Sequence, residues 1–340
     1  MAISRRTLRH ARAIRVDIDA AVEAAVADLV RAWGVAWDVV ADEWRAAVAE
    51  LTASMRDGRW PSRAVILRNA RVQAAMQVTA AKLEELGQLA GVRIVQGVPD
   101  LLASQEGKLL DVIRSQLPDS LEVDWARVPD RELDAIVRRT TRRVTSKLRP
   151  LPKSVTAGLK QELVRGVVTG TNPNQVASIL IKRFGTQFTG GLWRARTICR
   201  TEMLDACRAG ALDSRKANRG LLAGWRWLCS LSSRTCPSCL AMNGRTFDVD
   251  EPGPDDHPNG RCTSIPVTRS WAELGIDADE PESVFPDARS WFAQQTPAVQ
   301  QQIMGPARLQ ALNSGQLSWD QIPVPRTNPG WRRSFHPRAA

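Results

Sequence analysis

The chain has 340 residues, 43% hydrophobic and 24% charged, a composition typical of folded globular proteins and a length suited to two or three domains. Its formal net charge is +11, which favours polyanionic partners such as nucleic acid or an acidic protein surface, although an arginine-rich genome would give the same excess. With no tyrosine and three histidines, the sequence excludes a tyrosine nucleophile and leaves little equipment for a hydrolase.

Membrane and export signals are not evident. No apolar run approaches the roughly 18 residues that span a bilayer, and the basic N-terminus lacks the apolar core of a secretory signal. We therefore expect folding in a cytosol and no membrane partner. In that compartment we expect the six cysteines to be free thiols or metal ligands in preference to disulfides.

Residues 1–185 predict a helical domain. From Val22 to Leu51 apolar residues, three tryptophans among them, recur at steps of three and four, which places them on one buried face of a long helix. We expect Asp17 or Asp19 to cap the start of this helix. Glycines and prolines separate the further helices expected here, at residues 62–86, 101–116, 130–149, 155–169 and 174–184.

Residues 190–268 predict a small α+β module. The segment from 224 to 229 alternates apolar and polar residues, so Trp225, Trp227 and Cys229 share one side of a strand. The other elements expected in this module are a polar-faced helix at 192–218 and short strands at 245–249 and 263–267.

Residues 269–340 predict short helices followed by a Pro- and Arg-rich arm with little to bury, which is extended or disordered. The short helices are expected at 271–274, 288–294, 298–311 and 319–322. The predicted fold class is therefore α+β and predominantly α: a helical N-terminal domain, a small α+β module with a Cys/His knuckle, and a helical or extended C-terminal tail.

The most specific local signal is a C-x2-C knuckle followed by a histidine and a third cysteine. We define Cys236, Cys239, His257 and Cys262 as the Cys/His cluster. The knuckle points two thiols at one position, and the 17 residues between Cys239 and His257 allow one hairpin to return the chain to it. The spacing predicts a tetrahedral Zn²⁺ site with four protein ligands, which leaves no open position and favours a structural role over a catalytic one.

Other interpretations of these residues stay open. The cysteines can be unligated and buried, they can form a disulfide in an oxidising medium, or His257 can simply cap a turn. Cys229 is an alternative ligand. Cys199 and Cys207 are eight residues apart on an expected helix, about 12 Å, too far to bridge, and are expected in the core.

Five short motifs occur in a characteristic order: R-T-E at 200–202, W-R-W at 225–227, R-T-C-P-S-C at 234–239, N-G at 243–244 and H-P-N-G-R-C at 257–262. In this region, about residues 190–268, the chain resembles the Mu F-like head-morphogenesis proteins of tailed bacteriophages. The segment from Met304 to Asp320 looks like the one that often follows, and the helical first half is similar to members from actinobacteriophages. One position departs: Gly260 stands where the family pattern H-P-N-C-R-C has its first cysteine, so Cys262 must replace that ligand or the site is incomplete.

The resemblance implies a non-enzymatic minor capsid protein in the virion, at the portal vertex or the capsid interior. Implied partners are the portal protein and capsid or scaffold proteins, with packaged DNA as a further one. Two alternatives are a zinc-associated nuclease and a DNA-binding zinc module. A nuclease of the ββα-metal kind needs a second histidine near the first, which His10 and His336 are poorly placed to give.

Arg200, Glu202, Asp205 and Arg208 fall on one expected helix, with Asp205 and Arg208 as an i,i+3 pair. Arg200 and Glu202 point to different faces, so we expect structural bracing of different neighbours, such as the strand or the knuckle. Separately, Arg138, Arg139, Arg142 and Arg143 form a guanidinium ridge that suits phosphates or an acidic partner, although most charge runs are only solvated faces.

Overall fold

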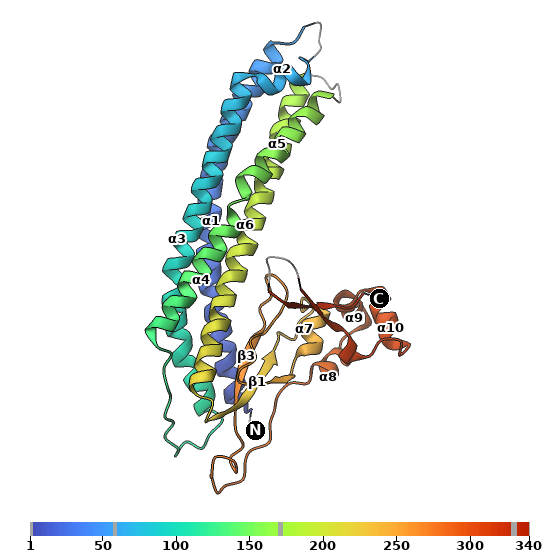
Figure 1. Cartoon of the computed structure of the whole chain (residues 1–340). Coiled ribbons are helices and arrows are strands. Elements are labelled where there is room, and N and C mark those ends of the chain that lie inside the picture. Colours follow the sequence, from blue (N-terminus) through green and yellow to red (C-terminus); the bar gives the residue numbers. More distant parts are fainter. Residues whose placement is uncertain (1–2, 57–59, 169–172, 328–331, 340) are drawn as a thin grey trace. The chain divides into compact units, whose positions relative to one another are not determined.

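The computed structural model describes residues 3–56, 60–168, 173–327 and 332–339, and it is mainly α with a small α+β module, as predicted (Figure 1). The long helices are α1 (Arg5–Ala53), α3 (Ala70–Arg114), α4 (Asp130–Leu148), α5 (Leu151–Val168) and α6 (Pro173–Ala217). The short helices are α2 (Arg63–Arg68), α7 (Pro237–Met242), α8 (Ala288–Ala293), α9 (Pro297–Met304), α10 (Pro306–Asn313) and the 3-10 turn η1 (Trp319–Gln321). The strands are β1 (Leu222–Leu228), β2 (Thr246–Phe247), β3 (Thr263–Thr268), β4 (Pro323–Arg326) and β5 (Ser334–Pro337).

The chain divides into two compact units. The bundle unit consists of residues 22–97 and 139–202, and the sheet unit of residues 1–21, 98–138 and 203–340. The predicted boundary between residues 185 and 190 falls inside α6, and the three-part domain division stays a prediction. Among the described residues, none of the helices combines the length and the apolar character needed to cross a membrane.

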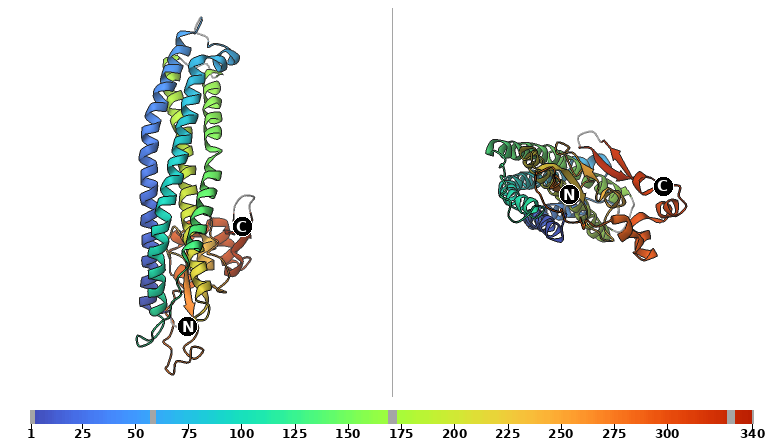
Figure 2. Two further views of the ribbon diagram at one scale, coloured as in Figure 1. Left: turned by 60° about the vertical axis from the view of Figure 1, so that its left-hand side comes forward. Right: turned by 90° about the horizontal axis from the view of Figure 1, so that it is seen from below.

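Aromatic packing holds the bundle unit together, where parts of α1, α3, α4–α5 and α6 lie side by side (Figure 2). The tryptophan face of α1 is in the core, as predicted: Trp33 and Trp37 each lie 5.3 Å from the ring of Phe188, and Trp44 lies 4.6 Å from that of Phe184. Such aromatic pairs contribute roughly 1 kcal/mol each beyond the area they bury. The indole of Trp33 also donates to the Phe188 carbonyl at 3.1 Å.

Three helices are longer than the sequence pattern indicated. α1 begins at Arg5, so Asp17 and Asp19 lie inside it and the predicted caps were wrong. α3 continues through Pro99, and α6 continues through the glycines at 190–191. A Cβ at Gly191 would lie 3.0 Å from Trp33 and 3.1 Å from Val155, so this glycine permits close helix packing, which offsets its low helix propensity. Residue 169, the expected end of the helix at 155–169, lies outside the described residues.

The sheet unit contains an antiparallel sheet with strand order β2–β1–β3, and all three strands were predicted. Trp225 and Trp227 on β1 are 1% exposed and pack with Leu240, Met242 and Met304. β1 needs Gly224, because a Cβ at this position would overlap the carbonyl of Phe247 on β2. This sheet and its core support the loops that carry the Cys/His cluster.

The C-terminal arm is extended, the first of the two predicted alternatives, and its described part is ordered rather than disordered. β4 and β5 form an antiparallel hairpin with Val324 opposite His336. Ser334 is fully buried, and Phe335 packs edge-on against Trp227 with ring centroids 6.1 Å apart. The amide of Phe335 donates to the Asp255 carbonyl at 2.7 Å. The arm therefore covers part of the core of the sheet unit. Its Pro- and Arg-rich sequence had given no reason to expect this burial.

A candidate metal centre

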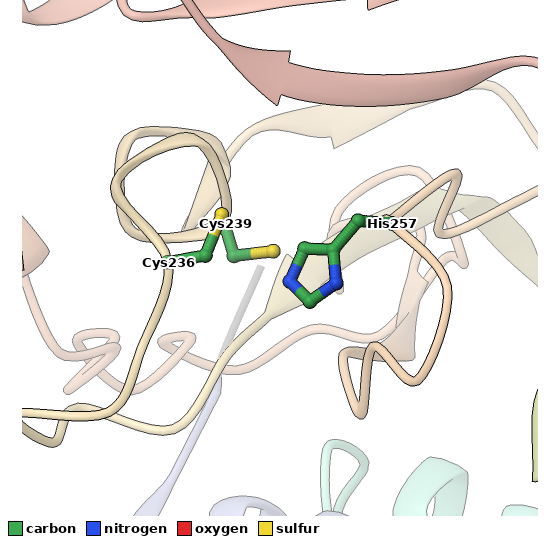
Figure 3. A group of neighbouring side chains, drawn as sticks. All are labelled: Cys236, Cys239 and His257. Atoms are coloured by element: carbon green, nitrogen blue, oxygen red, sulfur yellow. The ribbon is translucent and has the colours of Figure 1, made fainter. Parts of the chain in front are cut away.

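The C-x2-C knuckle is the first turn of α7. Cys236 is the N-cap residue, Pro237 occupies the first helical position, and the amide of Leu240 donates to the Cys236 carbonyl at 3.0 Å. Proline is favoured at this position because its missing N–H has no partner there in any helix. One helical turn thus brings the Cys236 and Cys239 thiols close together (Figure 3).

His257 reaches the same point from the loop between β2 and β3 (Figure 3). The ligand atoms of Cys236, Cys239 and His257 all lie within 4.8 Å of one another. His257 Nδ1 lies 2.9 Å from the Pro258 carbonyl, so this nitrogen can carry the ring proton and leave Nε2 as the ligand atom. Three of the four predicted ligands are therefore brought together.

The fourth predicted ligand, Cys262, is adjacent to this group. Its side chain hydrogen-bonds the Cys239 thiol. Its sulfur, however, does not lie within 4.8 Å of the ligand atoms of all three other residues. Cys229 interacts electrostatically with Cys262 and Cys236, and both Cys229 and Cys262 are buried. A set of thiols with one imidazole is the donor chemistry that zinc prefers. The residues therefore fit a zinc ion, with Cys262 favoured over Cys229 because of its contact with Cys239.

Without a bound metal, hydrogen bonds within the cluster favour a thiolate at Cys236 beside an imidazolium at His257. Hydrogen bonds from Cys239 and His257 lower the pKa of Cys236 to about 4. The hydrogen bond to Cys236 raises the pKa of His257 to about 9. At neutral pH Cys236 is thus already deprotonated, the state that a metal ligand needs.

We expect Cys236 to be the first cysteine alkylated by iodoacetamide in the metal-free protein at pH 6. Its pKa of about 4 makes it a thiolate at that pH, whereas burial raises the pKa of Cys199 and of Cys207 to about 12. Mass spectrometry of peptides after brief labelling gives the modified site. Labelling of Cys199 or Cys207 ahead of Cys236 would contradict this assignment, and added zinc should protect Cys236.

The departure at Gly260 has a steric reason. A Cβ at position 260 would overlap the Asp256 carboxylate, so a cysteine cannot stand there in this fold. Asp256 is fully buried and accepts the Cys262 amide at 3.0 Å. The space beside residue 260 is thus occupied by a carboxylate that orients the backbone of Cys262.

Asp205 and Arg208 brace this same loop from α6. Arg208 donates to Asp205 at 3.1 Å, to Asp256 at 2.8 Å, and to the carbonyls of Gly260 and Cys262 at 3.1 and 3.2 Å. Arg332, in the C-terminal arm, donates to Asp205 at 2.8 Å and to Asp256 at 3.0 Å. We call the four side chains of Asp205, Arg208, Asp256 and Arg332 the charge cluster. Two buried carboxylates are each paired with two guanidinium groups, so within the charge cluster the opposite charges compensate one another.

Sequence reasoning missed Asp256, Arg332 and His336. Asp256 offered a weak signal, since it directly precedes His257, but Arg332 is 127 residues from its partner Asp205 and gave none. His336, judged remote in the sequence, lies within electrostatic range of His257 and Cys236. Burial, with smaller contributions from Arg326 and His257, lowers the pKa of His336.

Arg200 and Glu202 have partners in the bundle unit and not at the strand or the knuckle. Arg200 pairs with Glu23 on α1. Glu202 is 1% exposed, pairs with Lys147 on α4, and lies 3.4 Å from Arg143. These pairs connect helices within the bundle unit.

The guanidinium ridge on α4 is divided between two environments. Arg138, Arg139 and Arg142 are exposed, whereas Arg143 is half-buried and faces Glu202. Residues 139–202 contain 13 lysines and arginines and 2 acidic residues, a net charge of +11 that equals that of the whole chain. Residues 22–97, the rest of the bundle unit, contain nine of each sign. The excess positive charge is therefore concentrated on the segments of α4, α5 and α6 in the bundle unit.

Neither a curated protein nor a solved structure matches this chain. A sequence model of one family does match, over a segment that begins in α5, ends in β3 and includes the whole Cys/His cluster. Residues 157–265 of this chain are similar to the family described as Phage Mu protein F like protein, which supports the resemblance to that family.

Proposed function

We propose that this protein is a structural minor capsid protein of a tailed bacteriophage, and that it resides in the virion at the portal vertex or inside the head. The observation that carries the proposal is the family match over residues 157–265, which spans the module built around the Cys/His cluster. We further propose an actinobacteriophage origin, which rests only on the resemblance of the helical first half to members of the family from such phages.

In this proposal the sheet unit is a metal-tied attachment module. Zn²⁺ bound by Cys236, Cys239, His257 and Cys262 would fix α7 and the loop before β3 in one arrangement. Arg208 would hold that loop against α6 through its hydrogen bonds to Asp256 and to the carbonyls of Gly260 and Cys262, and Asp205 would orient Arg208. The role of the metal is mechanical, and the proposed partners of the protein are the portal protein and the capsid or scaffold proteins.

The exposed arginines of α4 are the proposed contact to packaged DNA or an acidic head protein. We expect replacement of Arg138, Arg139 and Arg142 by glutamine to reduce incorporation into particles or retention of DNA, because three exposed cations are lost from one ridge. If duplex DNA is the partner, a plot of the logarithm of the binding constant against the logarithm of the salt concentration should become less steep. The magnitude of its negative slope should decrease by about 2–3, because each phosphate contact contributes roughly 0.9.

Glutamine at Arg5, Arg9 and Arg12 is the matched control, because it removes three exposed arginines from α1 with the same change in net charge. Incorporation is measured by quantifying the protein in purified particles, where we expect a low copy number, and by pull-down with the portal protein. Equal behaviour of the two triple variants would refute a role for the ridge. Absence of the unmodified protein from particles and their precursors would refute the capsid assignment.

A zinc-associated nuclease is the second candidate. One observation favours it: His336, which the sequence placed far from His257, lies in electrostatic range of it. Against it, Glu202 is buried and paired with Lys147, so this carboxylate is not available to a substrate. A magnesium-dependent nuclease assay with the His336→Ala variant as control separates the two functions.

A further inference from the structure

A row of uncharged side chains lies on the outer face of α6 in the bundle unit. We define Ile179, Thr186, Gly190, Trp193 and Thr197 as the outer stripe. Their spacing of seven, four, three and four residues keeps them on one face of a helix. The opposite face of α6 is the one in the core, where Leu180, Phe184 and Phe188 are fully or almost fully buried.

The outer stripe is apolar in character although two of its members are threonines. The Thr186 hydroxyl donates to the Lys182 carbonyl at 3.1 Å, and the Thr197 hydroxyl donates to the Trp193 carbonyl at 2.9 Å. Both hydroxyls are thus satisfied by their own helix. The two large apolar members are exposed: Trp193 is 60% exposed and Ile179 is 41% exposed.

Gly190 makes a notch in the outer stripe one turn from Trp193. A Cβ at Gly190 would meet no atom within 4 Å, so the backbone is open there to a close approach. Below the notch, Trp33 and Trp37 pack against Phe188, which makes the support rigid. A tryptophan beside a shallow notch on a rigid helix is the geometry of an interface hot spot.

Cations line both sides of the outer stripe. Lys182, Arg183, Arg194 and Arg196 flank it on α6, in the segment that carries the net charge of +11. An apolar centre within a charged rim is the anatomy of a protein–protein interface. Charge complementarity requires that the partner bring acidic residues to the rim.

Nucleic acid fits this surface less well. A duplex presents phosphates and has nothing to bury Ile179 and Trp193. Single-stranded bases could stack on an open indole, but the guanidinium of Arg196 already lies over the Trp193 ring, 4.7 Å from its centroid.

We propose that the outer stripe of α6 docks an amphipathic helix of a partner protein, with apolar residues on the docking face and acidic residues on either side. The helix lies along α6 and covers Trp193, and its carboxylates pair with the flanking lysine and arginines. This surface is distinct from the arginine ridge of α4 and does not depend on the proposed virion role.

The test uses the full-length protein and a synthetic fluorescent peptide of about 20 residues, a length of about 30 Å as a helix. The peptide has leucines on one face and glutamates beside them, and a second peptide has lysines in place of the glutamates. Trp193→Ala should raise the Kd of the acidic peptide roughly tenfold or more, as truncation of an aromatic hot spot does. Val35→Ala, which truncates a 69% exposed side chain on α1, is the matched control and should leave the Kd unchanged.

Anisotropy titrations with both peptides and with a duplex of about 20 base pairs complete the design. The double variant Lys182→Glu/Arg194→Glu should weaken the acidic peptide and strengthen the basic one. Because every altered side chain is at an exposed position, circular dichroism and thermal unfolding of the variants should match those of the unmodified protein. The proposal is overturned if the acidic peptide does not bind, if Trp193→Ala binds it as tightly as Val35→Ala, or if Trp193→Ala weakens the duplex and not the peptide.

Discussion

We expect the Cys236→Ser variant to bind no zinc at the proposed site, and its sheet unit to have lower thermal stability than that of the unmodified protein. Cys236 is the deprotonated member of a group whose ligand atoms lie within 4.8 Å of one another, and a serine hydroxyl does not replace a thiolate on zinc. Structural zinc contributes on the order of 10 kcal/mol in small finger peptides. The sheet unit also has its own core around Trp225 and Trp227, so we expect a loss of several kcal/mol rather than complete unfolding.

The control is Cys199→Ala, which removes a buried thiol of α6 that lies outside the Cys/His cluster. Metal content is measured by elemental analysis and stability by calorimetry, with and without a chelator. Chelation should lower the melting temperature of the unmodified protein and of Cys199→Ala but leave Cys236→Ser unchanged. Equal zinc content in Cys236→Ser and Cys199→Ala would rule out ligation by the knuckle.

Replacing Asp256 with asparagine will destabilise the protein by about 3–5 kcal/mol, the range found when one partner of a buried ion pair is removed. Asp256 is fully buried and accepts from Arg208, from Arg332 and from the Cys262 amide. Asparagine keeps the shape but leaves two guanidinium groups facing a neutral side chain. The asparagine amide would also point N–H groups at the N–H donors of Arg208, Arg332 and Cys262.

Asp320→Asn is the matched control, because Asp320 pairs with Arg245 at 3.3 Å but its side chain is 84% exposed. Exposed pairs contribute about 0–1 kcal/mol. Chemical denaturation of both variants gives the two free energies of unfolding. A cost for Asp256→Asn no greater than that for Asp320→Asn would show that the charge cluster does not stabilise the loop.

Local patterns predicted the parts of the fold that depend on local chemistry. The strand around Trp225 and Trp227 follows from alternation, and the knuckle follows from the spacing of Cys236 and Cys239. The lengths of α1, α3 and α6 did not follow, because tertiary packing outweighs the helix-breaking tendency of residues such as Pro99 and Gly191. At Gly191 the close approach of Trp33 and Val155 leaves little room for a Cβ, so packing favours glycine there in spite of its low helix propensity.

The metal ligands of the candidate site could be predicted from the sequence, but the residues that surround them could not. Cys236, Cys239 and His257 are close in sequence and occur in a recognisable order. Arg332 reaches Asp205 and Asp256 from the C-terminal arm, and this pairing depends on a hairpin whose burial has no local signature. The preference for glycine at position 260 likewise depends on where the Asp256 carboxylate lies.

Zinc X-ray absorption spectroscopy on the intact protein would show directly whether the Cys/His cluster ligates the metal. We expect a four-coordinate ion with three sulfur ligands at about 2.3 Å and one nitrogen ligand at about 2.0 Å. A first shell of oxygen and nitrogen alone, or a protein that retains no zinc after purification without chelators, would contradict this ligation.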